Sequence, residues 1–222
     1  GLVGESGCGK SMTAMSVMQL LQYPGRVVDG EILLDGKNLL EKSKREMDDI
    51  RGNKVSMIFQ EPMTSLNPVY TIGKQVSEAI LIHQKVSKEE ARERVIDIFR
   101  KVGIPEPEKR YSAYPHQLSG GMKQRGALAR ALCLRPGVLL MDEPFSSLDY
   151  MTKHGLYKSI KEMVEQTGAT VVMVTHDIEE ALCLGTSIRV LSKESGRFSG
   201  MYDQGGDGFS AGVREQMEGC LA

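Results

Sequence analysis

The sequence has few cysteines, no excess of charge of either sign and no long apolar run. Cys8, Cys133, Cys183 and Cys220 lie far apart without a CxxC pair, so neither a zinc knuckle nor a disulfide framework is expected. The 28 lysine and arginine residues nearly balance 29 aspartate and glutamate residues, which removes any general attraction to nucleic acid or to an anionic membrane. No apolar run approaches the roughly 20 residues of a membrane helix, and no signal-peptide pattern stands at the start. We therefore expect a soluble chain that binds any phosphate through a local site.

The order of the apolar runs predicts an α/β fold. The 222 residues suit one globular domain. Short β-type runs alternate with longer helical ones, which is the pattern of a parallel sheet covered by helices. We expect strands at 55–59, 138–141, 170–175 and 187–191. The runs at 138–141 and 170–175 are apolar throughout, as expected for central strands that are buried on both faces.

A mainly helical stretch at 72–134 separates the first two of these strands. One of its helices is expected to begin at Ser87, which is spaced from Glu90 as in a capping box, and to end near Gly103 and Pro105. The segment rich in glycine and serine after residue 195 predicts loose structure. The expected division is therefore a core at 1–71 and 135–194, an inserted helical subdomain at 72–134 and a loosely structured tail at 195–222.

The segment GESGCGKS at 4–11 matches the pattern GxxxxGK[ST] in full and precedes a helical pattern. Glycines let backbone N–H groups turn inward around phosphate oxygens, and the N-terminus of the helix adds its dipole. The lysine of such a loop reaches the β and γ phosphates of ATP, and the hydroxyl holds Mg²⁺. The many fixed positions favour this phosphate site over a glycine-rich turn without a ligand. The predicted ATP-binding residues are Gly4, Glu5, Ser6, Gly7, Cys8, Gly9, Lys10 and Ser11, and Ser11 is also a predicted Mg²⁺ ligand.

Two acidic residues follow the apolar run at 138–141. A phosphate-binding loop needs a second site for the metal and the water at the end of a buried strand, where geometry is fixed. Asp142 is the predicted Mg²⁺ anchor, and Glu143, which points to the other side of the chain, is the predicted base that orients and deprotonates water. Alone, the pair also fits an ordinary strand end, and the loop at 4–11 favours the functional interpretation.

The segment LSGGMKQR at 118–125 resembles the LSGGQ signature of ABC ATPases, with Met122 at the position that is usually Gln. This resemblance implies an ATPase of the P-loop type with a head-to-tail dimer, in which two ATP molecules lie between the loop of one subunit and the signature of the other. Ser119, Gly120 and Gly121 would receive the γ-phosphate at a helix N-terminus. The same three residues also fit a plain helix cap.

The other family positions follow in order. Gln60 resembles the Q-loop glutamine, residues 147–149 resemble the D-loop, and His176 resembles the switch histidine. The resemblance implies that Gln60 acts in catalysis and senses Mg²⁺, that His176 contacts the γ-phosphate, and that Asp149 works across the dimer interface. Family members stack adenine on an aromatic residue upstream of the loop. The N-terminal strands are accordingly expected to be truncated here, with weak binding of ATP.

The resemblance to subfamilies is mixed. The segments IFQEPMTSLNP at 58–68 and YPHQ at 114–117 are similar to di/oligopeptide and nickel importer ATPases, whereas ARAL at 129–132, LMDEPFSSLD at 140–149 and THDIEEAL at 175–182 are more similar to nitrate, sulfonate and taurine importer ATPases. The resemblance implies a peripheral subunit on the cytoplasmic face of the membrane. Its expected partners are a second ATPase subunit, permease subunits and indirectly a substrate-binding protein, without nucleic acid. Peptides or nickel are the favoured cargo; the alternatives are a nitrate-type importer, a soluble ABC ATPase without a transporter and a nucleotide-sensing module without hydrolysis.

Overall fold

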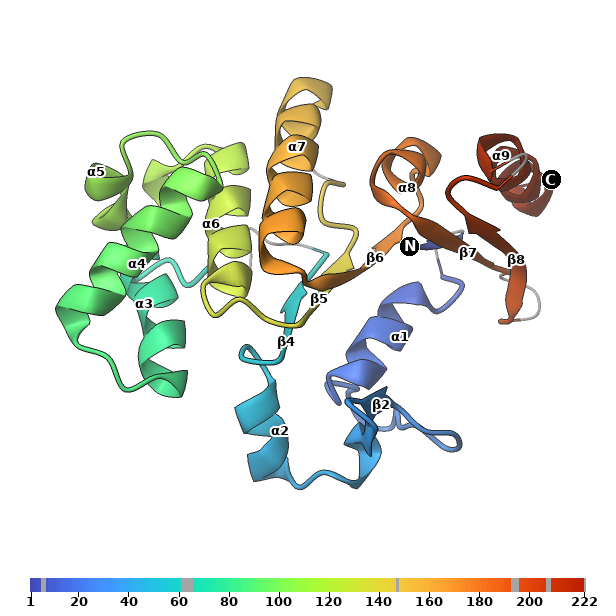
Figure 1. Cartoon of the computed structure of the whole chain (residues 1–222), viewed down its shortest axis with the longest axis horizontal. Helices are drawn as coiled ribbons and strands as arrows, with labels where there is room; N and C mark the ends of the chain where they lie inside the picture. The colour runs from blue at the N-terminus through green and yellow to red at the C-terminus, as the bar shows by residue number, and fades with distance from the viewer. Residues whose placement is uncertain (5–6, 61–65, 147, 193–195, 207–208, 222) are drawn as a thin grey trace. The chain divides into compact units, whose positions relative to one another are not determined.

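The computed structural model describes residues 1–4, 7–60, 66–146, 148–192, 196–206 and 209–221 (Figure 1). The chain divides into two compact units. The first unit comprises Gly1–Arg51, Leu140–Glu143 and Val172–Ala222, and the second comprises Gly52–Leu139 and Pro144–Val171. Each unit is described separately below.

The first unit is built on a sheet with helices. Its strands are β1 (Leu2–Gly4), β2 (Leu33–Leu34), β3 (Lys37–Asn38), the end of β5 (Val138–Asp142), most of β6 (Thr170–Thr175), β7 (Ser187–Leu191) and β8 (Phe198–Asp203). Its helices are α1 (Lys10–Val17), the 3-10 turn η1 (Leu39–Glu41), α2 (Lys44–Ile50), α8 (Ile178–Leu184) and α9 (Phe209–Leu221). The strand order is β5-β6-β1-β7-β8, with β2 and β3 forming a separate pair. Strand β1 runs parallel to both neighbours, with Leu2 opposite Val174 on β6 and Arg189 on β7.

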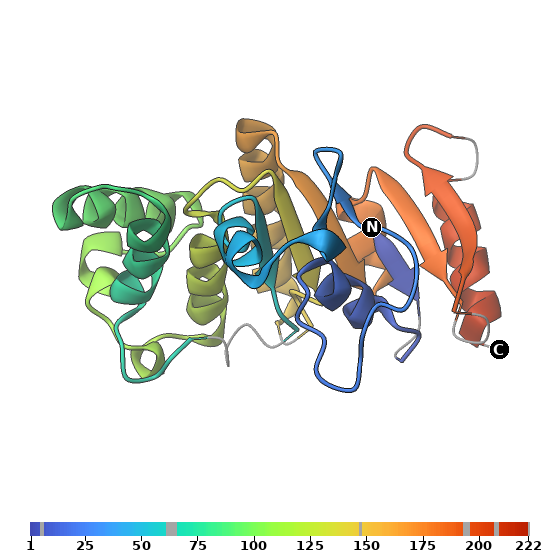
Figure 2. The same ribbon diagram turned by 90° about the horizontal axis from the view of Figure 1, so that it is seen from below.

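Residues 198–206 and 209–221 are ordered, which differs from the loose tail expected at 195–222. Strand β8 pairs antiparallel with β7, and α9 packs against both strands (Figure 2). Val213 of α9 is fully buried in a cluster with Val3 and Ile188, and Tyr202 packs against that cluster. A Cβ at Gly200 or at Gly212 would lie 2.7 or 2.5 Å from the Tyr202 ring. These glycines therefore let β8, α9 and the ring approach one another closely, which is a packing role that glycine content alone does not reveal.

The second unit contains most of the helices. Its elements are β4 (Val55–Ile58), α3 (Ile72–His83), α4 (Lys88–Lys101), α5 (Pro107–Tyr111), the 3-10 turn η2 (Pro115–Gln117), α6 (Gly120–Leu132), α7 (Tyr150–Thr167) and the beginnings of β5 and β6. The Val138 N–H donates to the Lys54 carbonyl at 3.0 Å, and the Thr170 N–H donates to the Gly137 carbonyl at 2.8 Å. The strand order here is β4-β5-β6.

Local side-chain and backbone interactions fix the ends of the helices in the second unit. Ser87 caps α4 by accepting the Glu90 N–H at 3.0 Å, as the sequence predicts. Gly103 follows the helix at a φ of 77°, a value that favours glycine. Helices α3, α4 and α6 pack side by side around fully buried Val76, Val95 and Phe99 (Figure 1). The predicted subdomain boundaries at 72 and 134 stay a proposal.

The predicted strands agree closely with the structure. The bounds of β6 and β7 are those predicted, β4 ends one residue earlier and β5 extends by one residue. The α/β fold class with a mainly parallel sheet is confirmed. No helix in the described ranges combines the length and the apolar character that a membrane crossing requires.

Candidate nucleotide site

The loop at 4–11 joins the end of β1 to the start of α1. Gly7 and Gly9 have φ values of 85° and 97°, and a Cβ at either position would meet no atom within 4 Å. The space beside these glycines is therefore open, and their backbone conformation is one that other residues rarely adopt. Gly4 is different, because a Cβ there would lie 2.5 Å from the Leu191 carbonyl oxygen and 2.9 Å from the Cys8 sulfur. Glu5 and Ser6 lie outside the described residues.

The lysine of the loop is buried. Lys10 is 4% exposed, and its Nζ donates to the Gly4 carbonyl oxygen at 2.7 Å and lies 3.7 Å from the Cys8 sulfur. The lysine ammonium only donates hydrogen bonds, so it is a group of the kind that can bind a phosphate oxygen. The first residue of α1 thus places a positive charge at the loop, in addition to the dipole of the helix.

Ser11 and Asp142 connect the loop to the end of β5. The Ser11 hydroxyl donates to Asp142 Oδ1 at 2.9 Å, and Asp142 is only 2% exposed. Burial raises the pKa of the Asp142 carboxyl, and the charge of Glu143 raises it further, whereas the Ser11 bond and the charge of Lys10 lower it. A hydroxyl and a carboxylate are oxygen ligands of the kind that Mg²⁺ takes, and Mg²⁺ commonly keeps several waters. The pair therefore fits a Mg²⁺ site with few protein ligands.

Glu143 and His176 meet at the ends of neighbouring strands. Glu143 Oε2 lies 3.2 Å from His176 Nδ1, with side chains 11% and 55% exposed. The Glu143 N–H donates to the Val174 carbonyl at 2.8 Å, which fixes the chain beside β6. The φ of Glu143 is 43°, a left-handed conformation that is uncommon outside glycine and that often marks functional sites. The two side chains form a polar pair that water can reach.

The turn that carries His176 contains two residues that sequence reasoning missed. Thr175 Oγ1 donates to Glu180 Oε2 at 2.7 Å in a buried bond, and it accepts the Asp177 N–H at 3.0 Å. Asp177 caps α8 by accepting the N–H groups of Glu179 and Glu180. The Asp-x-x-Glu spacing at 177–180 was an available signal for this arrangement.

The remaining predicted residues lie in the second unit. Gln60 follows β4 and is exposed. Ser119 caps α6 by accepting the Met122 N–H at 3.3 Å, so that Ser119 and Gly120 lie exposed at the helix start and Gly121 is half-buried. The Asp149 carbonyl accepts the Lys153 N–H at the start of α7, while Ser147 lies outside the described residues. The first unit thus brings together the loop, Asp142, Glu143 and His176, and the second unit carries Gln60, the signature and Asp149.

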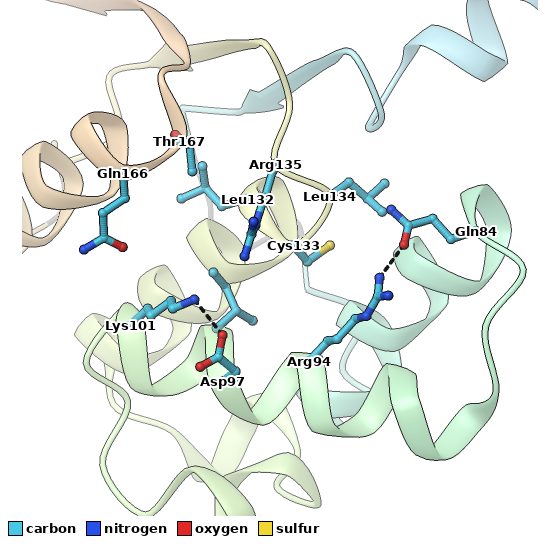
Figure 3. A pocket seen from close by; sticks show the side chains of 11 residues that line it. Gln84, Arg94, Asp97, Lys101, Leu132, Cys133, Leu134, Arg135, Gln166 and Thr167 are labelled. Carbon is cyan, nitrogen blue, oxygen red and sulfur yellow. Dashed lines mark hydrogen bonds and ion pairs between the residues drawn. The ribbon is translucent and has the colours of Figure 1, made fainter.

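The second unit also has a cavity of about 460 Å³. Its wall is formed by the ends of α3, α6 and α7 and by one face of α4. Arg94 points toward Gln84 and Lys101 toward Asp97, as Figure 3 shows. None of the predicted site residues lines this cavity, so it is separate from the predicted nucleotide site.

Comparisons with known proteins agree on one family. Residues 1–146 match the family model described as ABC transporter. The dipeptide transport ATP-binding protein DppD of Bacillus subtilis is 48% identical over 80% of this chain and 53% of its own length. The oligopeptide transport ATP-binding protein OppD of the same organism is 43% identical over 80% of this chain and 50% of its own length. The chain thus spans about half the length of these relatives.

Solved structures show the same fold. The dimeric structure of MJ0796, a bacterial ABC transporter cassette, is 30% identical with a TM-score of 0.81 over 92% of this chain and 84% of that chain. A post-hydrolysis dimer of the same cassette with ADP and Pi gives a TM-score of 0.80 with the same coverage and identity. The resemblance of the C-terminal part to nitrate, sulfonate and taurine importer ATPases stays a prediction.

Proposed function

The chain belongs to the ABC transporter family, and from this premise we propose that it binds and hydrolyses ATP to power an importer of di- or oligopeptides. The observation that carries the proposal is the arrangement of the first unit. There, a glycine loop, a buried lysine, a serine–aspartate pair and a glutamate–histidine pair lie at the ends of β1, β5 and β6. Such a set of groups can hold a phosphate chain and activate water beside it.

In the proposed mechanism, the loop N–H groups and Lys10 hold the β and γ phosphates. Ser11 and Asp142 would hold Mg²⁺, which neutralises phosphate charge when bound. Glu143 orients the attacking water and accepts its proton, because its carboxylate is accessible and is held toward His176. His176 Nδ1 lies 3.2 Å from Glu143 Oε2, and the other ring nitrogen, Nε2, would donate to a γ-phosphate oxygen when it carries a proton. Gln60 is proposed to contact the metal and the water.

We propose further that two subunits complete each other's sites. The exposed start of α6 at Ser119 and Gly120 offers backbone donors to the γ-phosphate of ATP on a second subunit, and Asp149 acts at the same interface. The dimeric cassettes with this fold support the arrangement. The other proposed partners are permease subunits and, through them, a substrate-binding protein, with this subunit peripheral at the cytoplasmic face of the membrane.

Peptide cargo is proposed from two observations. The relatives named above carry dipeptide or oligopeptide transport in their names, and the segments at 58–68 and 114–117 resemble the same subfamily. The peptide cargo is tested in vesicles that hold the assembled transporter. A peptide-loaded binding protein should stimulate ATP hydrolysis there. Equal stimulation by a nitrate-loaded binding protein would contradict it.

Hydrolysis is tested with Glu143→Gln. With Mg²⁺ and ATP, the wild-type chain is expected to release phosphate, and Glu143→Gln is expected to lose at least about 100-fold in kcat, because general base catalysis contributes about 10²–10⁴-fold. Binding of ATP should persist, since the amide retains the volume of the carboxylate. Glu165→Gln, at an exposed position of α7, is the matched control and should keep wild-type turnover. Unchanged turnover in Glu143→Gln would remove this residue from the role of base.

A further inference from the structure

A buried carboxylate lies behind the turn that carries His176. Glu180 is 2% exposed and Thr175 is 1% exposed, and the Thr175 hydroxyl donates to Glu180 Oε2 at 2.7 Å. Burying a carboxylate costs free energy unless hydrogen bonds compensate, and an apolar residue would fill the same space at lower cost. The presence of a carboxylate here therefore calls for a role in which its acceptor oxygens matter.

The bonds around Glu180 extend beyond the cap of α8. In a capping box, the acidic residue at the third helical position reaches back to the backbone N–H of the cap residue. Asp177 is the cap residue of α8 and Glu180 holds that third position. Here, however, Thr175 Oγ1 accepts the Asp177 N–H at 3.0 Å, and Glu180 accepts the hydroxyl proton of Thr175. The carboxylate thus reaches past the cap, to the residue that precedes His176.

The hydroxyl of Thr175 links both sides of His176. A hydroxyl has one proton to donate and two lone pairs to accept with. The proton of Thr175 goes to Glu180, and one lone pair takes the N–H of Asp177, so the backbone on each side of His176 is tied to the same group. The His176 side chain itself is 55% exposed and has little packing to hold it, which leaves the turn to orient its ring.

We propose that Thr175 and Glu180 are positioning residues that hold the His176 ring against Glu143. The proposal rests on the ATPase function proposed above. Neither residue contacts the reacting atoms; both act through His176, whose Nδ1 lies 3.2 Å from Glu143 Oε2. Displacement of a catalytic group by about 1 Å can cost about 100-fold in rate, so loss of the tie is expected to lower kcat more than the affinity for ATP.

The test compares variants of nearly equal shape in the full chain. Thr175→Val removes the hydroxyl and should lower kcat by about 10- to 100-fold with KM for ATP within about twofold. Glu180→Gln retains an acceptor oxygen and should restore most of the rate that Glu180→Leu loses. Thr186→Val, at an exposed position before β7, is the matched control and should leave kcat and KM unchanged.

A double-mutant cycle separates positioning from a structural role. In the His176→Ala background, Thr175→Val should lower kcat no further, because the group through which it acts is gone. An equal loss of kcat in both backgrounds would overturn the proposal. The NMR resonances of the His176 ring give a readout without turnover: Thr175→Val should shift them in the nucleotide-free chain, and unchanged resonances would also overturn it. A wild-type chain that binds ATP without hydrolysing it would contradict the proposed function, while the ring resonances would still decide the positioning role.

Discussion

Ser11→Ala tests the hydrogen bond between Ser11 and Asp142 in the candidate site. The substitution removes the 2.9 Å hydrogen bond to Asp142 Oδ1 and little else, because alanine suits the second position of a helix. The carboxylate that loses the bond is only 2% exposed. Water therefore cannot readily replace the serine hydroxyl, and the free energy of unfolding should fall.

The size of the effect follows from the charge of the acceptor. Hydrogen bonds to charged groups contribute about 1.5–3 kcal/mol, and each kcal/mol corresponds to about 2–4 °C in Tm for a chain of this size. The expected loss at pH 7 is therefore about 3–12 °C. Because the Ser11 bond lowers the pKa of Asp142, it favours the ionised carboxylate. The cost of Ser11→Ala should accordingly shrink as the pH falls through the raised pKa of Asp142, towards the roughly 1 kcal/mol of a neutral hydrogen bond.

The assay is urea unfolding of the nucleotide-free chain without Mg²⁺, at pH 7 and near pH 4. It measures both the loss of stability in Ser11→Ala and the change of that loss with pH. Ser16→Ala in the same helix is the matched control, since the Ser16 hydroxyl donates only to the Met12 carbonyl at an exposed site. The control should stay within about 0.5 kcal/mol of the wild type. Equal losses in the two variants, or a loss in Ser11→Ala that does not change with pH, would refute the reasoning.

Four further substitutions probe the same two units. Asp142→Asn should abolish hydrolysis yet stabilise the chain at pH 7, by about 0.5–2 kcal/mol in urea unfolding. The pKa of the Asp142 carboxyl is raised in the folded chain, so this carboxyl contributes stability below its unfolded pKa and loses that contribution as the pH rises through its folded pKa. The stability gained by Asp142→Asn should therefore vanish in acid. Gly4→Ala should destabilise by about 1–3 kcal/mol, because its Cβ would lie 2.5 Å from the Leu191 carbonyl oxygen, and a wild-type Tm would contradict this. Gly73→Ala should cost a similar amount, since its Cβ would lie 2.4 Å from the Tyr111 ring. Gly126→Ala adds a Cβ whose nearest neighbour would be Leu66 Cδ1 at 3.8 Å, so this substitution should be neutral or stabilising by up to about 1 kcal/mol. A comparable loss of Tm in Gly73→Ala and Gly126→Ala would exclude close contact as the cause.

Features that depend on neighbouring residues were predicted correctly from the sequence. The cap at Ser87 is confirmed because a cap needs only a side chain and the N–H groups two or three residues later. The strands at 170–175 and 187–191 are confirmed, and the apolar run at 170–175 is typical of a strand inside a parallel sheet. These elements also place His176 and Asp142 at strand ends, where the sequence predicted them.

Features that depend on distant contacts were not predicted. The order in residues 198–206 and 209–221 arises because Val213 and Tyr202 pack on a cluster that includes Val3, which is distant from both in the sequence. The glycine content of this segment predicted loose structure, because the sequence does not distinguish a glycine packed against a tyrosine ring from a glycine in a flexible turn. The bond from Thr175 to Glu180 was not predicted for a related reason, because it joins residues on the two sides of a turn whose backbone path the sequence does not show.

The separation of roles proposed for Asp142 and Glu143 depends on the backbone at the end of β5. Successive side chains of a strand point to opposite faces, and β5 ends at Asp142. Glu143 then takes a φ of 43°, while its N–H remains bonded to Val174. Asp142 therefore stays buried against Ser11, and Glu143 lies beside His176 with its side chain 11% exposed. A metal ligand needs a fixed, dry position and a base needs access to water, and one residue of left-handed backbone supplies both from adjacent positions.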